Sequence, residues 1–508
     1  MSAKVFSASN IGLTSHLIEV EADISSSTTA FFIVGLPDAA VTEAKERVRS
    51  AIKNCDLPFP RTKVTVNLAP ADLKKVGPSF DLPIAVAILA AKKLIKLENK
   101  DQQSLFIGEL SLDGSLRPVA GVLPIASSLE KLKIKRLYLP AANAQEAGLI
   151  EGLEIFPVKH LRQLIDHLKG EQLIARFKKS PLKITGQENK TIIDLNHIKG
   201  QEQVKRALII AAAGYHNMLM IGPPGSGKTL LAKALRDLLP PLSFAESLEV
   251  TKIYSLAGLL PPAQPLIIAR PFRSPHHTSS GIALVGGGSF PKPGEITLAH
   301  RGILFLDELP EFPRAVLENL RQPLEDGLIT VSRASTTVQF PARFTLIATA
   351  NPCPCGYATD LEKPCRCSPM QIQKYQKKIS GPLLDRIDLQ VAVPRLNMRE
   401  LTDKKITTTT KNFSEQIKIA QEKQAERFKN LPWLYNSEID HKKIEEFCRL
   451  DMESEQLLKT AIVKFQLSAR SYHKILKISR TIADLEQSEA IKLQHVAEAL
   501  QYRQNILQ

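Results

Sequence analysis

The sequence lacks long apolar runs and has few cysteines and few acidic residues. No stretch approaches the roughly 18–20 apolar residues that a membrane-spanning helix needs, and the first residues contain no apolar segment followed by a small-residue cleavage site. We therefore expect no membrane association and a cytoplasmic protein. Apolar residues make up 44% of the chain and charged residues 23%, as in ordinary globular proteins. A length of 508 residues predicts two to four domains.

Acidic residues are too few to balance the basic ones. The chain has 67 Lys and Arg against 52 Asp and Glu, which gives a formal net charge of +15. Such an excess favours polyanionic partners, nucleic acid first. The basic residues are scattered rather than grouped in blocks, so a generally basic surface with no specific partner explains the charge equally well.

Four of the six cysteines fall within fifteen residues, as the pairs CPC and CRC separated by nine residues. A cytosolic setting argues against a disulfide framework. Four thiolates can close a tetrahedral Zn²⁺ site, although two-residue spacers are more usual than one-residue spacers. Reduced structural thiols are the alternative to zinc. The candidate ligands are Cys353, Cys355, Cys365 and Cys367.

The pattern along the chain indicates three domains and two linkers. Val64–Pro70 and Lys135–Ala141 have the composition of strands, and Ala39–Asn54 has helical spacing. The last segment contains no glycine and has Pro432 as its one proline, which predicts four or five helices. The expected parts are an α/β domain at 1–168, a linker at 169–192, a second α/β domain at 193–395, a linker at 396–413 and a helical domain at 414–508.

A nucleotide-binding loop lies near the middle of the chain. The residues MLMIGPPGSGKT form an apolar strand and a glycine-rich loop, and LLAKALRDLL then has helical spacing. This is the context of a P-loop, in which backbone N–H groups curl round the phosphates of ATP at a helix N-terminus. Lys228 is expected to reach the β- and γ-phosphates, and Thr229 to ligate Mg²⁺. The loop residues are Gly222, Pro223, Pro224, Gly225, Ser226, Gly227, Lys228 and Thr229.

Two apolar strands that follow end in polar residues. The first, GILFLDE, ends in Asp307 and Glu308 about 80 residues after the P-loop. At the carboxyl edge of a parallel sheet, Asp307 would hold Mg²⁺ and Glu308 would deprotonate the attacking water. The second, FTLIATAN, ends in Asn351, whose amide can position that water. In isolation, the acidic pair also fits a solvated turn after a strand.

An arginine between apolar residues, Arg386 in GPLLDRIDL, is a candidate for reaching a phosphate held by a neighbouring subunit. Phosphoryl transfer is governed by placed positive charge, so such a finger would have a large effect. The alternative from the residues alone is an intramolecular salt bridge with Asp385 or Asp388.

Together these residues resemble the magnesium-chelatase-like AAA+ ATPases, in particular the ComM/YifB branch. The resemblance covers nearly the whole chain, and its most specific strings are RPFRSPHHTSSGIALVGGG, ATANPCPCGY and SARSYHKILKISRTIADL. It implies a P-loop AAA+ core, a C-terminal helical lid and a ring, most often a hexamer, with ATP sites between subunits. It assigns the sensor-1 role to Asn351, the arginine-finger role to Arg386 and the sensor-2 role to Arg470.

The N-terminal domain resembles the Lon-protease catalytic fold. GPSFD (Gly77–Asp81) matches the nucleophile loop of that fold and puts Ser79 at the nucleophile. A serine needs a base to act as a nucleophile at neutral pH. In Lon-type proteases the base is a lysine, and PVAGVLP (Pro118–Pro124) has Leu or Pro at that place. We expect a retained fold without proteolysis.

Two segments have the composition of a DNA-contacting loop. An insertion at about 250–298 combines basic residues with the glycines 286–288, and TVSRASTTVQF reads as a hairpin. Flexible glycine beside Arg and Lys suits a loop that binds phosphates without reading sequence. Chelatase motors carry similar insertions, so the composition also fits a motor that never touches DNA. The candidates are Arg270, Arg273, His276, His277, Lys292 and Arg333.

The sequence thus predicts an Mg²⁺- and ATP-dependent hexameric DNA motor. The family resemblance implies branch migration on single-stranded and branched DNA during natural transformation. One alternative is the ATPase subunit of a complex that inserts a metal into a tetrapyrrole. Another is an ATP-gated scaffold that exposes its N-terminal domain to protein partners. Stimulation of the ATPase by DNA separates the first reading from the other two.

Overall fold

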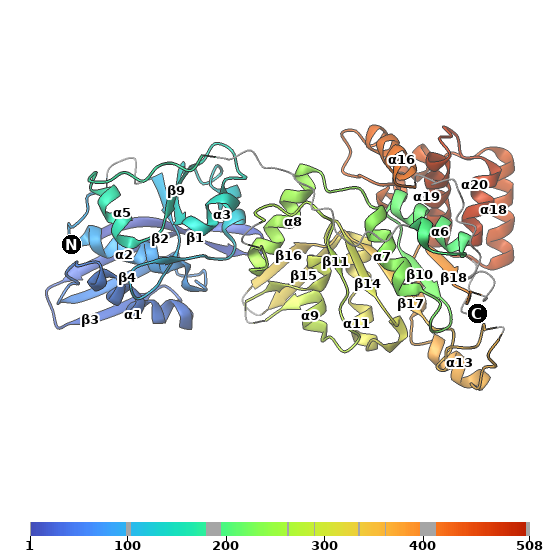
Figure 1. The fold of residues 1–508 in the computed structure, drawn as a ribbon, viewed down its shortest axis with the longest axis horizontal. Helices are drawn as coiled ribbons and strands as arrows, with labels where there is room; N and C mark the ends of the chain where they lie inside the picture. The colour runs from blue at the N-terminus through green and yellow to red at the C-terminus, as the bar shows by residue number, and fades with distance from the viewer. Residues whose placement is uncertain are drawn as a thin grey trace.

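The computed structural model describes residues 2–97, 103–178, 195–261, 264–288, 290–333, 336–360, 362–396 and 413–503. Figure 1 shows three parts in a row: the N-terminal domain, a central core and a C-terminal group of helices. Of the two expected linkers, 179–192 and 397–412 lie outside the described residues. Within the described residues, no helix combines the length and apolar character needed to cross a membrane.

The N-terminal domain is built on a seven-stranded mixed sheet. Buried and half-buried residues alternate along strands such as β4. Helix α1 (Ala39–Asn54) forms over the range that the apolar spacing predicts, and Asp38 caps it by accepting a hydrogen bond from the N–H of Val41 at 2.8 Å. Across the sheet the strands are β3 (Ala30–Val34), β4 (Lys63–Ala69), β2 (Thr14–Ser25), β1 (Ser2–Ile11), β5 (Ser104–Phe106), β8 (Arg136–Pro140) and β9 (Glu154–Val158).

The core is a five-stranded sheet in which every pair of neighbours is parallel. Its central strands are short apolar runs, buried on both faces, as parallel strands covered by helices are. All carboxyl ends therefore meet at one edge of the sheet, here called the carboxyl edge, and all amino ends at the opposite one, the amino edge. In order the strands are β11 (Phe272–Arg273), β14 (Ile303–Leu306), β17 (Thr345–Ala350), β10 (Met218–Ile221) and β18 (Leu389–Ala392).

Two small hairpins and several helices lie around this sheet. The longest helices of this part of the chain are α6 (Glu202–Gly214), α7 (Lys228–Leu238) and α8 (Phe244–Ala257). One hairpin pairs β12 (Gly286–Gly287) with β13 (Lys292–Pro293), and the other pairs β15 (Leu328–Arg333) with β16 (Thr336–Pro341).

The N-terminal domain rests on the core through two contacts. Its β1–β2 turn packs against the β15–β16 hairpin, so closely that a Cβ on Gly12 would lie 2.4 Å from Cγ1 of Val338. Its helix α3 (Val122–Ser128) lies on α8, where the buried Glu146 accepts a hydrogen bond from Ser255 of the core. The domain thus contacts the core at the β15–β16 hairpin and at α8.

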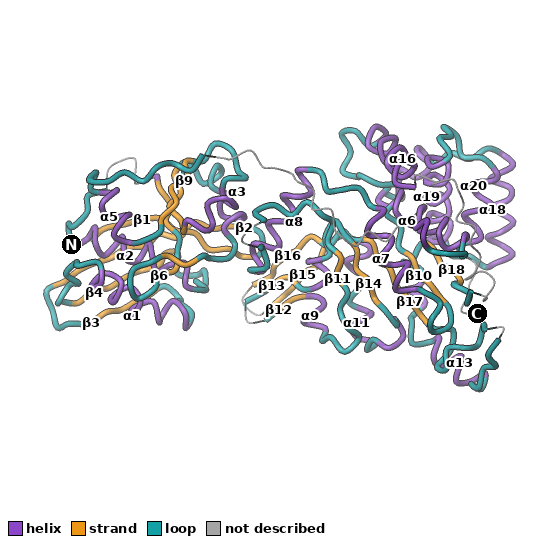
Figure 2. Tube along the Cα trace, viewed as in Figure 1, coloured by secondary structure: helices purple, strands orange, loops and turns teal. Residues whose placement is uncertain are grey.

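The C-terminal region is helical, as the tube in Figure 2 shows. Its helices share one continuous apolar core with α6 and one face of the core sheet. The lid is therefore packed on the core rather than separate from it. Its helices are α16 (Phe413–Arg427), α17 (Ile444–Phe447), α18 (Met452–Phe465), α19 (Ala469–Leu485) and α20 (Leu493–Gln501).

The remaining described elements are short or lie at the periphery. They are α2 (Asp81–Ala91), α4 (Ala144–Ala147), α5 (Leu161–Leu168), α9 (Gly281–Val285), α10 (Glu295–Leu298), α11 (Arg314–Glu318), α12 (Arg321–Asp326), α13 (Pro369–Gln376), α14 (Gly381–Leu384), the strands β6 (Glu109–Leu110) and β7 (Leu116–Arg117), and 3-10 turns at Pro78–Phe80, Ala141–Asn143, Leu195–His197, Leu309–Glu311, Asn436–Glu438 and His441–Lys443.

Candidate nucleotide-binding site

The P-loop connects the carboxyl end of β10 to the first turn of α7. Gly225 and Gly227 have φ values of 78° and 86°, in the left-handed region that favours glycine. Gly227 is also the N-cap of α7, so the loop turns directly into the helix N-terminus. This puts backbone N–H groups and the positive end of a helix dipole at the carboxyl edge, where phosphates bind in such folds.

Lys228 reaches back across the loop. Its Nζ donates hydrogen bonds to the carbonyls of Gly222 at 2.7 Å and Pro223 at 2.9 Å, and to Oδ1 of Asn351 at 3.4 Å. Burial lowers the pKa of the Lys228 ammonium, and the nearby carboxylates of Asp307 and Glu308 oppose that shift. The P-loop lysine and the tip of β17 therefore meet at one point.

Asp307 lies beside Thr229, at the end of β14. The Thr229 hydroxyl donates to Oδ2 of Asp307 at 3.2 Å, which pairs a hydroxyl and a carboxylate oxygen as Mg²⁺ requires. Glu308 follows at a φ of 53°, and its side chain is exposed. The residues present thus fit Mg²⁺·ATP, with Glu308 free to approach an attacking water.

Thr349 is a further member of this site that the sequence analysis missed. This fully buried residue of β17 donates its hydroxyl hydrogen to Oδ1 of Asp307 at 2.5 Å and accepts from the backbone N–H of Glu308 at 2.9 Å. It therefore fixes both acidic residues from the neighbouring strand. Only the parallel pairing of β14 with β17 brings it there, since it lies inside an apolar run with no motif of its own.

Arg386 and Arg470 lie together at the amino edge, away from the P-loop. The backbone carbonyl of Arg386 accepts from the side chain of Asn217, which immediately precedes β10, whereas the P-loop follows β10. Both guanidiniums bind one carboxylate: Glu325 accepts from Nη2 of Arg386 and, at 3.0 Å, from Nη2 of Arg470. The salt bridge of Arg386 is thus with Glu325, not with Asp385 or Asp388.

A buried ion pair fixes the lid helix α19 to this edge. Lys474, one turn after Arg470, lies 2.6 Å from Oδ1 of Asp388, and Oδ2 of Asp388 accepts from the N–H of Asn217 at 2.8 Å. Burial disfavours ionisation of Asp388, but Lys474 and His216 outweigh it and hold the pKa of this carboxyl well below its usual range. Arg470 therefore projects from a helix that is held against the sheet.

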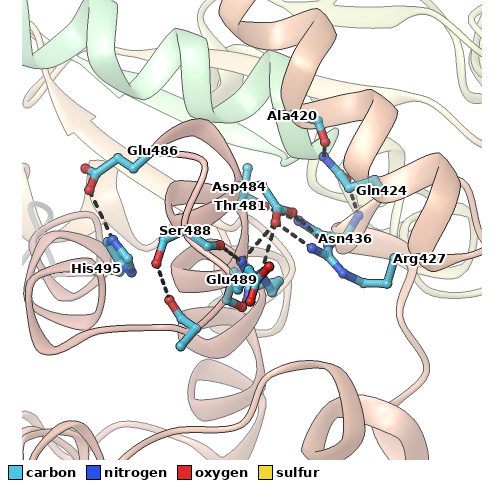
Figure 3. A network of polar contacts seen from close by, with 12 residues as sticks. Ala420, Gln424, Arg427, Asn436, Thr481, Asp484, Glu486, Ser488, Glu489 and His495 are labelled. Atoms are coloured by element: carbon cyan, nitrogen blue, oxygen red, sulfur yellow. Dashed lines mark hydrogen bonds and ion pairs between the residues drawn. The ribbon is translucent and has the colours of Figure 1, made fainter.

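The other end of α19 is fixed by a polar network within the lid (Figure 3). The fully buried Asp484 accepts from Arg427 of α16 at 2.8 and 2.5 Å and from Asn436 at 2.9 Å. Asn436 also donates to Thr481, whose hydroxyl lies 2.8 Å from His216 of the core. Helix α19 is thus pinned at both ends, which sets the position of Arg470.

The four clustered cysteines meet beside the P-loop. Their sulfurs all lie within 4.8 Å of one another, with Cys353 3.3 Å from Cys355 and 3.7 Å from Cys365. Tetrahedral ligands at the usual Zn–S distance of about 2.3 Å have sulfurs about 3.8 Å apart, so the four thiols lie close enough together to surround one zinc ion. The loop also packs on the P-loop, since a Cβ on Gly356 would lie 2.5 Å from Pro224.

The candidate DNA-contacting residues occupy different environments. Arg270 is buried, and its guanidinium binds Glu246, the carbonyls of Pro240 and Arg301, and the hydroxyl of Tyr435. This leaves it no N–H for a phosphate. Arg273 makes two hydrogen bonds with Glu295, at 2.6 and 2.7 Å.

The remaining candidates are more open. Lys292 and His276 are exposed, and His277 is half-buried and packs edge-on against Phe312. Lys292 lies in the β12–β13 hairpin, beside the run of glycines with positive φ. Arg333 ends β15, and its side chain is outside the described residues.

The Lon-like site of the N-terminal domain has no lysine where the resemblance expects the base. That place is taken by Leu123 and Pro124, both buried in α3. Leu123 packs with Leu266 of the core, and its N–H donates to Glu146. This segment therefore contributes to the contact between domains.

Comparison with known proteins gives matches along most of the chain. A family described as magnesium chelatase, subunit ChlI, matches residues 194–401, and its companions, described as subunit ChlI of Mg-chelatase and as the ChlI C-terminal region, match residues 20–143 and 407–503. The Magnesium-chelatase 38 kDa subunit of Rhodobacter capsulatus is 25% identical over 197 residues, which cover 35% of this chain and 55% of that protein.

Several relatives match over nearly their whole length. Competence protein ComM of Haemophilus influenzae is 43% identical over 510 residues, covering 99% of this chain and 97% of that protein. Uncharacterized protein YifB of Escherichia coli is 42% identical over 496 residues, covering 97% and 95%. The chain, with its P-loop, its acidic strand end and its helical lid, therefore belongs to the ComM/YifB branch of the magnesium-chelatase-like AAA+ ATPases.

Proposed function

We propose that this protein is an Mg²⁺- and ATP-dependent ring motor that moves branch points in DNA. The observation that carries the proposal is the separation of its functional side chains. The P-loop and the acidic pair lie at the carboxyl edge, and Arg386 and Arg470 lie at the amino edge. Strands of four to six residues, at about 3.3 Å per residue, keep the edges roughly 13 Å or more apart.

Arginines that serve hydrolysis must reach the γ-phosphate, which this separation prevents within one subunit. A second copy that docks its carboxyl edge against this amino edge completes the site. Such a head-to-tail contact closes into a ring, and the family resemblance implies a hexamer. In each site, Lys228 would hold the phosphates, Thr229 and Asp307 would ligate Mg²⁺, Glu308 would activate water, and Asn351 would position it.

Mixed rings test the shared site. Arg386→Ala and Lys228→Ala should each be inactive alone, because one lacks the finger and the other lacks the phosphate-binding lysine. Mixed together, they should regain part of the ATPase activity, since some interfaces then combine an intact Arg386 with an intact Lys228. No recovery at any mixing ratio, with rings confirmed by light scattering, would count against a shared site.

DNA as the substrate is supported by charge and by position. The chain carries a net charge of +15, Lys292 and His276 are exposed, and Lys292 lies beside glycines with positive φ. The relative named for competence points in the same direction, because DNA taken up in natural transformation recombines with the chromosome. We propose that the β12–β13 and β15–β16 hairpins contact the DNA backbone inside the ring, in the cytoplasm, with no sequence preference.

The decisive assay is strand exchange on a labelled four-way junction, with ATPase rates measured with and without that junction. Wild-type rings should process the junction only with hydrolysable ATP and Mg²⁺, and binding should weaken steeply with salt. Lys292→Ala should reduce junction binding, and Lys429→Ala, an exposed lysine on the lid, is the matched control. Active rings that ignore the junction, with an ATPase rate unchanged by DNA, favour the chelatase-type or scaffold reading.

We also propose that the cysteine cluster holds one Zn²⁺. The ion would brace the loop that leaves Asn351 and packs on Pro224, because four thiolates would tie its two ends together. Elemental analysis of the purified protein should give about one zinc per chain. Cys365→Ser should lose the metal, and Cys55→Ala, which changes a cysteine far from the cluster, should keep it. Four free thiols without metal in an active protein would exclude the site.

A further inference from the structure

Glu325 is the one carboxylate that both amino-edge arginines bind. Its two oxygens are divided between them, with Oε2 on Arg386 and Oε1 on Arg470. The Nε of Arg386 is buried and bonds to no atom of the described residues, while its Nη1 donates to the carbonyl of Pro382 at 2.9 Å. Two guanidiniums are therefore arranged around a single anion, and the Nε–H of Arg386 has no acceptor among the described residues.

The surroundings of this group leave room for a larger anion. A cavity of about 550 Å³ opens here, and its lining includes Arg301, Arg343, Lys474 and Lys477 besides the two arginines, together with the carboxylates of Glu325, Asp326, Asp385, Asp388, Glu438 and Asp440. Burial disfavours the Glu325 carboxylate, but the hydrogen bonds and charges of Arg386 and Arg470 together outweigh it and lower the Glu325 pKa, so the group is ionised at neutral pH. Arg386 and Arg470 thus share a carboxylate with one charge, whereas a phosphate would offer them more charge and more acceptor oxygens.

The contact of Glu325 with Arg470 is easily exchanged. The side chains of Glu325 and Arg470 are 48% and 53% exposed, and exposed ion pairs contribute little to stability. The Arg386 side chain is 13% exposed, so Glu325 is the exposed partner of that pair. The buried pair of Lys474 and Asp388 beside it is the opposite case, because separating the two would leave a buried charge without its ion-pair partner. Glu325 can therefore release its arginines without disturbing the helix that carries Arg470.

Glu325 is linked directly to the β15–β16 hairpin. It lies at the end of α12, and the next residue but one, Gly327, turns the chain into β15. The carbonyl of Gly327 accepts from Ala342 at the other end of the hairpin at 2.8 Å, and its N–H donates to Pro323 of α12 at 3.0 Å. Movement of the hairpin base therefore moves the end of α12 and the carboxylate of Glu325.

We propose that Glu325 is a positioning residue that holds Arg386 and Arg470 as an anion-binding pair and yields them to the γ-phosphate of a neighbouring subunit's ATP when the β15–β16 hairpin is displaced. Until the hairpin is displaced, the Glu325 carboxylate competes with the γ-phosphate for the two arginines. This inference rests on the proposed function, because it requires a site shared between subunits and a ligand that displaces the hairpin.

The test is the ATPase of full-length Glu325→Gln rings, measured with and without a DNA junction. Glutamine keeps the shape of the side chain but loses the competing charge. Without DNA, kcat/KM for ATP should rise about threefold to tenfold, the range expected for losing exposed ion pairs. Stimulation by DNA should fall towards one. Glu325→Asp, which keeps the charge on a shorter side chain, should lie between glutamine and wild type.

Two further variants separate positioning from a structural effect. Asp326→Asn removes the same charge from the same end of α12 and should behave as wild type, because the structure records no ion pair between Asp326 and either arginine. Glu325→Gln combined with Arg386→Ala should fall to the rate of Arg386→Ala alone, since the gain depends on the freed arginine. A merely structural role would not make the two changes interdependent in this way.

Three outcomes would overturn the inference. Glu325→Gln rings as slow as Arg386→Ala rings would mean that the carboxylate supports catalysis. Rates equal to those of Asp326→Asn would mean that Glu325 has no role. If Glu325→Gln raises the ATPase rate as much in rings that also carry Arg386→Ala, Glu325 acts elsewhere. If wild-type rings ignore DNA, the DNA proposal fails, but the gain without DNA still decides the role of Glu325.

Discussion

The two edges of the core sheet hold functional side chains in different ways. At the carboxyl edge, hydrogen bonds connect Lys228 with Asn351 and Thr229 with Asp307, and Glu308 is exposed. At the amino edge, buried ion pairs fix the framework, and Glu325 and Arg470 lie on it as an exposed pair. The exposed pair can exchange partners, whereas the helix that carries Arg470 is held in place by the buried pair.

The largest expected effects are at the carboxyl edge. Lys228→Ala should abolish nucleotide binding, because the lysine is the charge that neutralises the phosphates. Glu308→Gln should bind ATP and hydrolyse it about 100-fold more slowly or worse, because it removes the base without removing the phosphate contacts. Fluorescent-nucleotide binding and steady-state ATPase assays measure the two steps separately. A wild-type rate in Glu308→Gln would make the assignment of the base wrong.

At the amino edge the expected effect is first on stability. Lys474→Met should leave Asp388 charged and without its lysine in a buried position, which costs about 3–5 kcal/mol of unfolding free energy. Urea unfolding monitored by circular dichroism measures the loss. Lys459→Met breaks an exposed pair with Glu455 and should cost less than about 1 kcal/mol. Equal losses of unfolding free energy in both variants would contradict the contrast between the buried ion pair and exposed ion pairs.

The carboxyl edge could be predicted from the sequence, because its residues lie in contiguous motifs. A glycine-rich loop between a strand and a helix, and two carboxylates at the end of an apolar run, are local patterns with one structural meaning. The strand β14 and the helix α1 form where apolar spacing predicts them. Local patterns of this kind need no knowledge of what packs against them.

The amino edge could not be predicted, because its contacts join residues far apart in the chain. Glu325 meets Arg470 across 145 positions. The same limit applies to Thr349 at the carboxyl edge, which reaches Asp307 from a neighbouring strand. Arg270 was also mispredicted because of distant contacts, here as an exposed residue when it is buried. Its glycine-rich and basic surroundings suggest an open loop, but Glu246 and Tyr435, which is 165 positions away, enclose its guanidinium.

Lowering the pH should destabilise the amino edge, because it protonates Glu249. A hydrogen bond from His300, with Arg301 beside it, lowers the pKa of Glu249 from 4.5 to about 2. A folded-state pKa below the unfolded value contributes stability above pH 4.5 that is lost as the pH falls towards about 2. Glu249→Gln should therefore show a smaller loss of melting temperature between pH 7 and pH 3 than wild type.

The control for this variant is Glu453→Gln, which removes one exposed carboxylate in the first turn of α18. It should lose stability with acid as wild type does. Identical profiles for Glu249→Gln and Glu453→Gln would mean that the contact of Glu249 with His300 and Arg301 contributes nothing, and that the acid sensitivity of this edge lies in other carboxylates.

The smallest expected effect lies outside both edges, at Ser79 of the N-terminal domain. We predict no peptidase activity, because Leu123 and Pro124 occupy the place where the Lon-like resemblance expects a lysine, and a serine without a base is a poor nucleophile at neutral pH. Ser79→Ala should leave the ATPase rate and the processing of DNA junctions unchanged. Casein digestion with and without ATP is the direct measurement. Cleavage that ATP stimulates and that Ser79→Ala abolishes would show that the N-terminal domain is a peptidase and that this prediction is wrong.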